Sequence, residues 1–224
     1  MCFSPAVSFV SGAVLISIGA ATLNANYSRP QFMLNSMPLL FGAQQVAEGF
    51  VWRELQNSSV VGATPAVLSF LGFALVIWPA WVPWSVYNIE TIFWRKKVLL
   101  ILGGLGIGVG LSTLWLLLKS GPEAYPEGHS IGYRFSNWVR VLPANFEFAS
   151  YILTSLFPFF FSSKGWVKTT GTLIFLGMVL AMIVRERAVT SVWCFFAAIV
   201  SVYIAWHVYS SNRVFASKAV SIKT

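Results

Sequence analysis

The second apolar stretch of the chain, SMPLLFGAQQVAEGFVWRE, carries polar side chains at helical spacing. Gln44 and Gln45 precede Glu48 by four and three residues, and Trp52 follows it by four, so a helix would place them on one face. In apolar surroundings a carboxyl group is either protonated or paired, because an isolated charge is costly there. The pattern fits a site for a proton or a small ligand. It also fits a neutral glutamic acid that hydrogen-bonds a glutamine or a neighbouring helix.

A second polar line runs along the fifth apolar stretch and contains Glu147 and Tyr151. If its face meets the face of Glu48, the two would enclose a cavity that opens at one end of the molecule. His129 and Tyr133 belong to the preceding loop and would lie at the same end. A histidine there could be a metal ligand or a catalytic residue, although a solvated loop histidine is the ordinary case.

Two more titratable groups, Glu90 and His207, fall at the other end of the molecule from Glu48 and His129. Each lies at or near the end of an apolar stretch. Glu90 comes shortly before Arg95, Lys96 and Lys97, which favours a salt bridge at the membrane surface. His207 follows Tyr203 by four residues near the end of the last stretch, where an interfacial position or a role in proton relay is expected. Together with Glu48, these groups could mark the two ends of a path across a membrane.

The elements that position these residues are long apolar segments. Apolar residues make up 57% of the 224-residue chain and charged residues 10%, too few charges to solvate the surface of a soluble domain of this size. A bilayer core is crossed by about 20 apolar residues in a helix. We expect one all-α transmembrane domain over residues 1–224, a bundle of seven helices near residues 5–23, 32–52, 60–84, 98–118, 145–161, 167–184 and 189–209.

The basic residues favour one orientation of this bundle. Of the fifteen Lys and Arg residues, nine fall in the loops and tail on one side, including the Arg95–Lys97 run, and six fall on the other. The positive-inside rule then places the N-terminus outside and the C-terminus inside, with anionic lipids at the inner face. No basic run is interleaved with aromatic residues on a polar surface, so nucleic acid is not an expected partner.

The segment 119–144 is the one long loop, and this orientation places it outside. It would form a lid or an interfacial helix over the bundle, or remain without regular structure. At the inner end of the third stretch, Trp78, Trp81, Trp84 and Tyr87 are typical of an interfacial aromatic belt, with an aromatic box for a cofactor as the alternative.

Small residues indicate close helix packing. In GGLGIGVG, Gly104 and Gly108, and likewise Gly106 and Gly110, are four residues apart, a spacing that lets helix backbones approach within a molecule or between copies of it. Ser8 and Gly12 on the first stretch share this spacing. A homo-oligomer assembled through glycine faces is one consequence. In the last stretch, Ser191, Cys194, Ala198, Ser201 and Ala205 form a similar narrow face.

Several classes of chemistry are poorly supported. Residues 189–209 contain no lysine for a retinal, and two histidines are too few for a histidine-only zinc site. We therefore expect neither a metal nor a cofactor, and no catalytic residue is assigned. The leading hypothesis is a multi-pass membrane protein that binds or moves a small ligand or a proton around Glu48. The alternatives are a structural or sensory interaction protein, or an intramembrane enzyme in which Glu48 and His129 converge on a metal or water.

The chain resembles an uncharacterised family of bacterial seven-helix integral membrane proteins, a domain of unknown function that opens with Met-Cys-Phe-Ser. The resemblance rests on five segments, together with Glu90, that span most of the chain: MCFSPAVSF at 1–9, LLFGAQQVAEGFVW at 39–52, WPAWVP at 78–83, HSIGY at 129–133 and SVWCFFAAIVS at 191–201. It implies a multi-pass protein of the bacterial inner membrane and no established activity. The family residues carried over as candidates are Gln44, Gln45, Glu48, Pro79, Pro83, Glu90 and Cys194.

Overall fold

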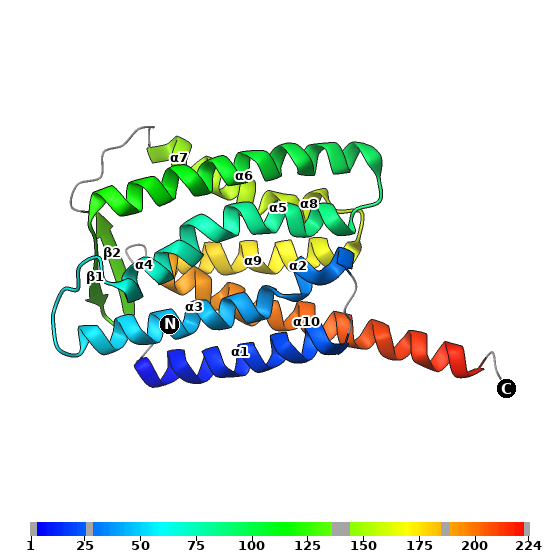
Figure 1. The fold of residues 1–224 in the computed structure, drawn as a ribbon, viewed down its shortest axis with the longest axis horizontal. Helices are drawn as coiled ribbons and strands as arrows, with labels where there is room; N and C mark the ends of the chain where they lie inside the picture. Colours follow the sequence, from blue (N-terminus) through cyan, green and yellow to red (C-terminus); the bar gives the residue numbers. More distant parts are fainter. Residues whose placement is uncertain (1–3, 26–28, 136–143, 185–188, 222–224) are drawn as a thin grey trace.

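The computed structural model describes residues 4–25, 29–135, 144–184 and 189–221, and most of them are helical. The helices lie side by side in one elongated bundle, with a β-hairpin at one end and the last part of α10 extending beyond the other (Figure 1). The helices are α1 (Pro5–Ala25), η1 (Arg29–Gln31), α2 (Phe32–Asn35), α3 (Met37–Leu55), α4 (Pro65–Leu71), the π-helix η2 (Gly72–Ile77), α5 (Trp78–Ile89), α6 (Phe93–Ser120), α7 (Ala144–Ser155), α8 (Phe157–Phe161), α9 (Gly165–Val184) and α10 (Val189–Ser221). The strands are β1 (Pro122–Glu127) and β2 (Ser130–Phe135).

The predicted all-α class is confirmed. Among the described residues, five helical segments are long and apolar enough to cross a membrane: Pro5–Ala25, Pro65–Ile89, Phe93–Ser120, Gly165–Ile183 and Thr190–Ser210. Helices also cover the predicted ranges 32–52 and 145–161, but both are broken, at Ser36 and at Leu156. In each case a proline, Pro38 or Pro158, stands in the first turn of the helix that follows, where its missing N–H removes no helical hydrogen bond. The count of seven spans and their orientation stay predictions.

The third predicted range, 60–84, is shifted along the chain: a continuous helical segment runs from Pro65 to Ile89 and changes its helical type along its length. α4 passes into the π-helix η2, which leads directly into α5 just before Pro79. Proline cannot donate to the carbonyl four residues earlier, so a locally wider turn accommodates it. The Tyr151 hydroxyl of α7 donates to the Ala74 carbonyl within η2 at 2.6 Å. The distortion therefore supplies a backbone acceptor that ties α7 to the centre of the bundle.

Glycines allow the closest helix contacts, as the small-residue pattern predicts. On α6, a Cβ added to Gly106 would lie 1.9 Å from the Pro79 carbonyl oxygen, and one added to Gly110 would lie 2.7 Å from that of Val76. Gly12 of α1 packs in the same way on Gly42 of α3. Gly104 and Gly108, by contrast, have no atom within 4 Å of an added Cβ, so these two do not pack against another helix of the chain.

The start of the expected 119–144 loop is a β-hairpin rather than a helix or a structureless loop. α6 ends at Ser120 and is followed by Gly121, whose φ of 56° favours glycine; β1 and β2 pair antiparallel around Gly128. Val61 adds a bridge to Ala124, and both Ala124 and Ile131 are completely buried against the ends of α3, α4 and α6. The hairpin is thus a packed cap on one end of the bundle, which we call the hairpin end (Figure 1). Residues 136–143 lie outside the described residues.

Candidate functional site

The predicted polar face of α3 meets three other helices in the interior. Glu48, Gln44 and Gln45 are all completely buried. The Glu48 carboxyl accepts a hydrogen bond from the Ser191 hydroxyl of α10 at 2.5 Å and one from the Gln45 amide at 3.2 Å. The Gln45 carbonyl accepts in turn from the Ser11 hydroxyl of α1 at 3.3 Å. We call these four residues, with Gln44, the Glu48 network; it links α1, α3 and α10.

Gln44 extends the network toward α5. Its amide oxygen accepts a hydrogen bond from the Trp78 indole N–H at 2.8 Å, while its amide nitrogen faces the Cys194 thiol and has no oxygen or nitrogen partner among the described residues. A thiol is only a weak acceptor, and Cys194 also lies beside Glu48. An unsatisfied buried donor costs about 1–3 kcal/mol, so native proteins contain few of them. The Gln44 amide is therefore a feature that packing alone does not explain.

Trp78 does not lie in the interfacial aromatic belt that its place in the sequence predicted. Its ring is buried and stacks on Phe41 with ring centroids 4.0 Å apart, so it belongs to the core. Trp81 is partly buried and donates to the Met33 carbonyl at 2.9 Å. The reason is that two helices cover this end of α5: the break at Ser36 brings α2 against it, and α3 supplies Gln44 as a partner. Trp52, the last residue of the predicted α3 face, is also buried, and its indole N–H has no partner among the described residues.

A small cavity of about 40 Å³ lies beside the Glu48 network. We call it the central cavity; its described lining residues come from six helices: Met37, Phe41, Trp78, Val82, Tyr151, Ser155, Phe159, Ile174, Trp193, Cys194, Ala197, Ser201 and Ile204. Trp78 and Cys194, two of these residues, contact the network. Glu48, Gln44 and Gln45 do not line the cavity themselves. The carboxyl and amide groups were expected to line the cavity. Instead the Trp78 indole and the Cys194 thiol line it, and the carboxyl and amide groups lie behind these two side chains.

A much larger groove, of about 1090 Å³, lies between α6, α7 and the start of α10. We call it the lateral groove. Glu147 lines it, together with Gly104 and Gly108 of α6, while Glu48 does not. Tyr151, Trp193 and Cys194 line both the groove and the central cavity, so the two spaces meet at these three side chains. The polar lines of α3 and α7 therefore meet through side chains of other helices, with Cys194 lining both spaces beside Gln44 and Glu48.

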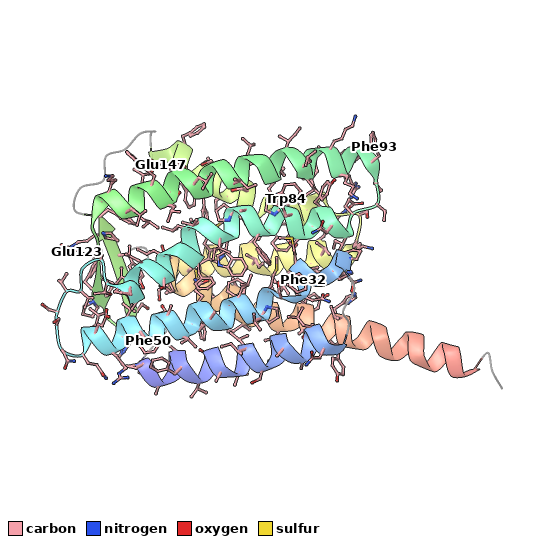
Figure 2. The ribbon with its side chains drawn as sticks, in the orientation of Figure 1. Phe32, Phe50, Trp84, Phe93, Glu123 and Glu147 are labelled. Atoms are coloured by element: carbon pink, nitrogen blue, oxygen red, sulfur yellow. The ribbon has the colours of Figure 1, made fainter. Side chains whose placement is uncertain are left out.

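The other predicted residue of this end, His129, is exposed in the turn between β1 and β2. Glu48, by contrast, is completely buried among the helices, so the structure places the two side chains in different surroundings. Among the described residues, no group of three or more His, Cys, Asp or Glu side chains could hold a metal ion. Glu147 and the hairpin lie toward the same end of the bundle, as Figure 2 shows for Glu147 and Glu123.

Glu90 lies at the opposite end of the bundle, and its partners differ from the expected ones. Its buried carboxylate accepts hydrogen bonds from the backbone N–H groups of Thr91 and Ile92, both at 2.9 Å, and of Ser163 at 2.5 Å. Arg95 instead donates to the Ser162 carbonyl at 2.7 Å. The expected salt bridge to the basic run is not formed, because backbone N–H groups left free at the start of α6 and before α9 provide closer partners.

The Glu90 carboxylate connects the turn before α6 with the turn before α9 through its hydrogen bonds. This role predicts a specific pH dependence of stability. Burial raises the pKa of Glu90, but the hydrogen bonds from Ile92, Ser163 and Thr91 outweigh it and hold the pKa below its ordinary value of 4.5. Ionised Glu90 therefore stabilises the fold above about pH 4.5, and this stabilisation is lost as pH falls through the lowered pKa. We expect Glu90→Gln to lower the unfolding free energy by about 2 kcal/mol at neutral pH. Thermal melts from pH 7 to 3 should show the two proteins converging at low pH; a constant difference would contradict this role.

His207 is partly exposed on α10 and stacks on Trp166 of α9, with ring centroids 4.4 Å apart. Tyr203 lies farther away, at 6.5 Å between centroids. Glu90 and His207 are thus held by different partners.

The sequence did not predict Ser11 and Ser191 as partners in the Glu48 network. The spacing of Ser191 predicted a packing face only, although its hydroxyl donates to Glu48. The available signal was its residue type, because a serine within an apolar helix often hydrogen-bonds a neighbouring helix.

The fold and the enclosed polar network are those of an α-helical membrane protein, since five described helices are long and apolar enough to cross a bilayer. The chain belongs to the family described as Family of unknown function (DUF6629), whose sequence profile matches residues 1–220. No curated protein and no solved structure matches the chain.

Proposed function

We propose that this chain is a multi-pass membrane protein that binds a small, membrane-soluble molecule whose polar end reaches the central cavity, with the Glu48 network as the polar wall behind it. The observation that carries the proposal is the buried Gln44 amide nitrogen, which has only the Cys194 thiol as a weak acceptor among the described residues and lies beside Trp78 and Cys194 of the cavity lining. A bound acceptor group reaching this position would satisfy it. Glu48, held by Ser191 and Gln45, is the group through which a proton could be linked to binding.

The membrane setting is part of the proposal: a bacterial inner membrane, with the end that carries Arg95, Lys96 and Lys97 on the inner side. Phe93 and Trp94 beside this run are exposed, and Lys97 lies over the Phe93 ring at 4.6 Å from its centroid. Exposed aromatic rings with cationic neighbours are typical of the head-group region, where the basic run would attract anionic lipids.

An interaction protein is the second candidate, and one observation favours it. Gly104 and Gly108 are four residues apart on α6, with open space beside them, and a second copy of the chain could pack there. In this alternative the Glu48 network only fixes helix packing. It predicts a stable oligomer in mild detergent and no bound small molecule.

The first test is the removal of the Gln44 amide group. Gln44→Leu should lower the retention of a co-purified small molecule, detected by mass spectrometry of a solvent extract of the detergent-purified protein, by about tenfold. The matched control is Gln56→Leu, because Gln56 is exposed at the end of α3. It should leave retention unchanged.

The same proteins should be titrated with a total lipid extract of the host membrane. A higher melting temperature is expected for the wild type and for Gln56→Leu, but not for Gln44→Leu. A wild-type protein that carries no small molecule and is not stabilised by the extract would overturn the proposal and favour the interaction protein.

A further inference from the structure

The lateral groove shows how such a molecule could enter, and of which class it is. We propose that the groove admits the hydrocarbon chain of a neutral, single-chain lipid directly from the bilayer, with its oxygen-bearing end placed at Trp193 and Cys194. This inference deepens the proposed function and rests on it for the central cavity as the space that the polar end of the molecule reaches. The groove itself is a separate feature of the surface and can be tested separately.

In the proposed bilayer the groove lies at hydrocarbon depth. Its α6 wall runs from Gly104 to Leu116 and falls within the candidate membrane span Phe93–Ser120. Its α10 wall begins at Thr190, the first residue of another candidate span. A groove at this depth opens sideways to lipid rather than to water, so a hydrocarbon chain is the occupant available to it.

The size and shape of the groove suit a chain. The two glycines leave α6 without side chains where other residues would fill the space, because neither has an atom within 4 Å of an added Cβ. Leu105, Val109 and Leu153 supply apolar walls along the same space. The volume of about 1090 Å³ is slightly larger than the range typical of small-molecule sites, about 300–1000 Å³, and leaves room for a hydrocarbon chain.

The residues where the groove meets the central cavity indicate which chemical group the polar end of the bound lipid carries. The Trp193 indole nitrogen is buried there and has no hydrogen-bond partner in the described part of the chain, whereas the Tyr151 hydroxyl already donates to Ala74. An indole N–H can only donate, so the group that binds it is an acceptor such as a carbonyl, ether or hydroxyl oxygen. Glu147 lines the same groove and disfavours an anionic head group. A neutral oxygen acceptor on a hydrocarbon chain satisfies both conditions.

Photocrosslinking in lipid vesicles tests this inference. The probe is a long-chain primary alcohol that carries a diazirine on its chain, and the crosslinked peptides are mapped by mass spectrometry. We expect crosslinks to concentrate on the α6, α7 and α10 segments that line the groove. Gly108→Leu fills the groove from a position with free space and should reduce crosslinking there at least about fivefold. Gly72→Leu is the matched control, because Gly72 also has free space but does not line the groove.

Three outcomes would overturn the inference. Crosslinks spread evenly over all lipid-facing helices and unaffected by Gly108→Leu would show that the groove holds no particular chain. Conversion of a wild-type dimer into a monomer by Gly108→Leu would show that a second copy occupies it. If Gly108→Leu leaves the retained small molecule unchanged while Gln44→Leu removes it, the groove inference fails and the proposed function stands.

Discussion

Gly106→Ala is expected to destabilise the bundle by about 3 kcal/mol or more, beyond the usual cost of an added methyl group in a packed interior. The new Cβ would lie 1.9 Å from the Pro79 carbonyl oxygen and 2.7 Å from the Pro79 carbonyl carbon. Both atoms belong to the backbone, so no side-chain rotation relieves the overlap, and α6 must move away from α5. At about 2–4 °C per kcal/mol, the melting temperature in detergent should fall by roughly 6–12 °C.

Gly108→Ala is the matched control for this prediction. It is the same substitution two residues further along the same helix, where an added Cβ has no atom within 4 Å. Because alanine is favoured over glycine inside a helix by about 0.5–1 kcal/mol, this variant should melt slightly above the wild type. Equal melting temperatures for the two variants would show that α6 does not rest on Pro79 as described.

Removal of the Glu48 side chain is the other change with a large expected effect. Glu48→Ala deletes a completely buried side chain and leaves the Ser191 hydroxyl and the Gln45 amide without this acceptor. Loss of one partner in a buried polar network costs about 3–5 kcal/mol. The contacts between α3 and α10 should loosen first, because Ser191 is a direct link between these helices. Thermal unfolding in detergent, followed by tryptophan fluorescence, measures the loss.

Glu127→Ala provides the comparison for Glu48→Ala, because Glu127 lies at the turn of the hairpin and is partly exposed. This variant should stay within about 0.5 kcal/mol of the wild type. Glu48→Gln keeps the shape of the side chain and an acceptor oxygen for Ser191, so it should lose less stability than Glu48→Ala. If Glu48→Ala melts together with the wild type, the Glu48 network does not hold these helices together.

The fold class and the approximate helix positions could be predicted from sequence because each depends on local pattern. Apolar runs of membrane length, separated by charged residues, predict helices regardless of their neighbours. The breaks of 32–52 and 145–161 follow from Pro38 and Pro158, which are also visible in the sequence. The hairpin was not predicted, since it depends on the burial of Ala124 and Ile131 against the ends of α3, α4 and α6, a long-range effect.

The candidate site was only partly predictable. Spacing alone places Gln44, Gln45 and Glu48 on one face of α3, and the cost of burying a carboxyl group predicts that Glu48 has partners. Which partners it has depends on helix order in space, and no local pattern encodes this. The same applies to Glu90, whose neighbours in sequence suggested a salt bridge although its partners are backbone N–H groups, one of them at Ser163.

The sequence by itself determined that this protein is helical, that most of its surface suits lipid, and where its polar groups interrupt that surface. Only the tertiary structure decided that Ser191 meets Glu48, that Trp78 meets Gln44, and that Cys194 lies between the Glu48 network and two separate spaces. Helix formation depends on bonds within a few residues of each other, whereas the site depends on contacts between residues as far apart as 143 positions. Those contacts are chosen by side-chain shape and by the glycines that let helices approach, and they exist only once the bundle has packed.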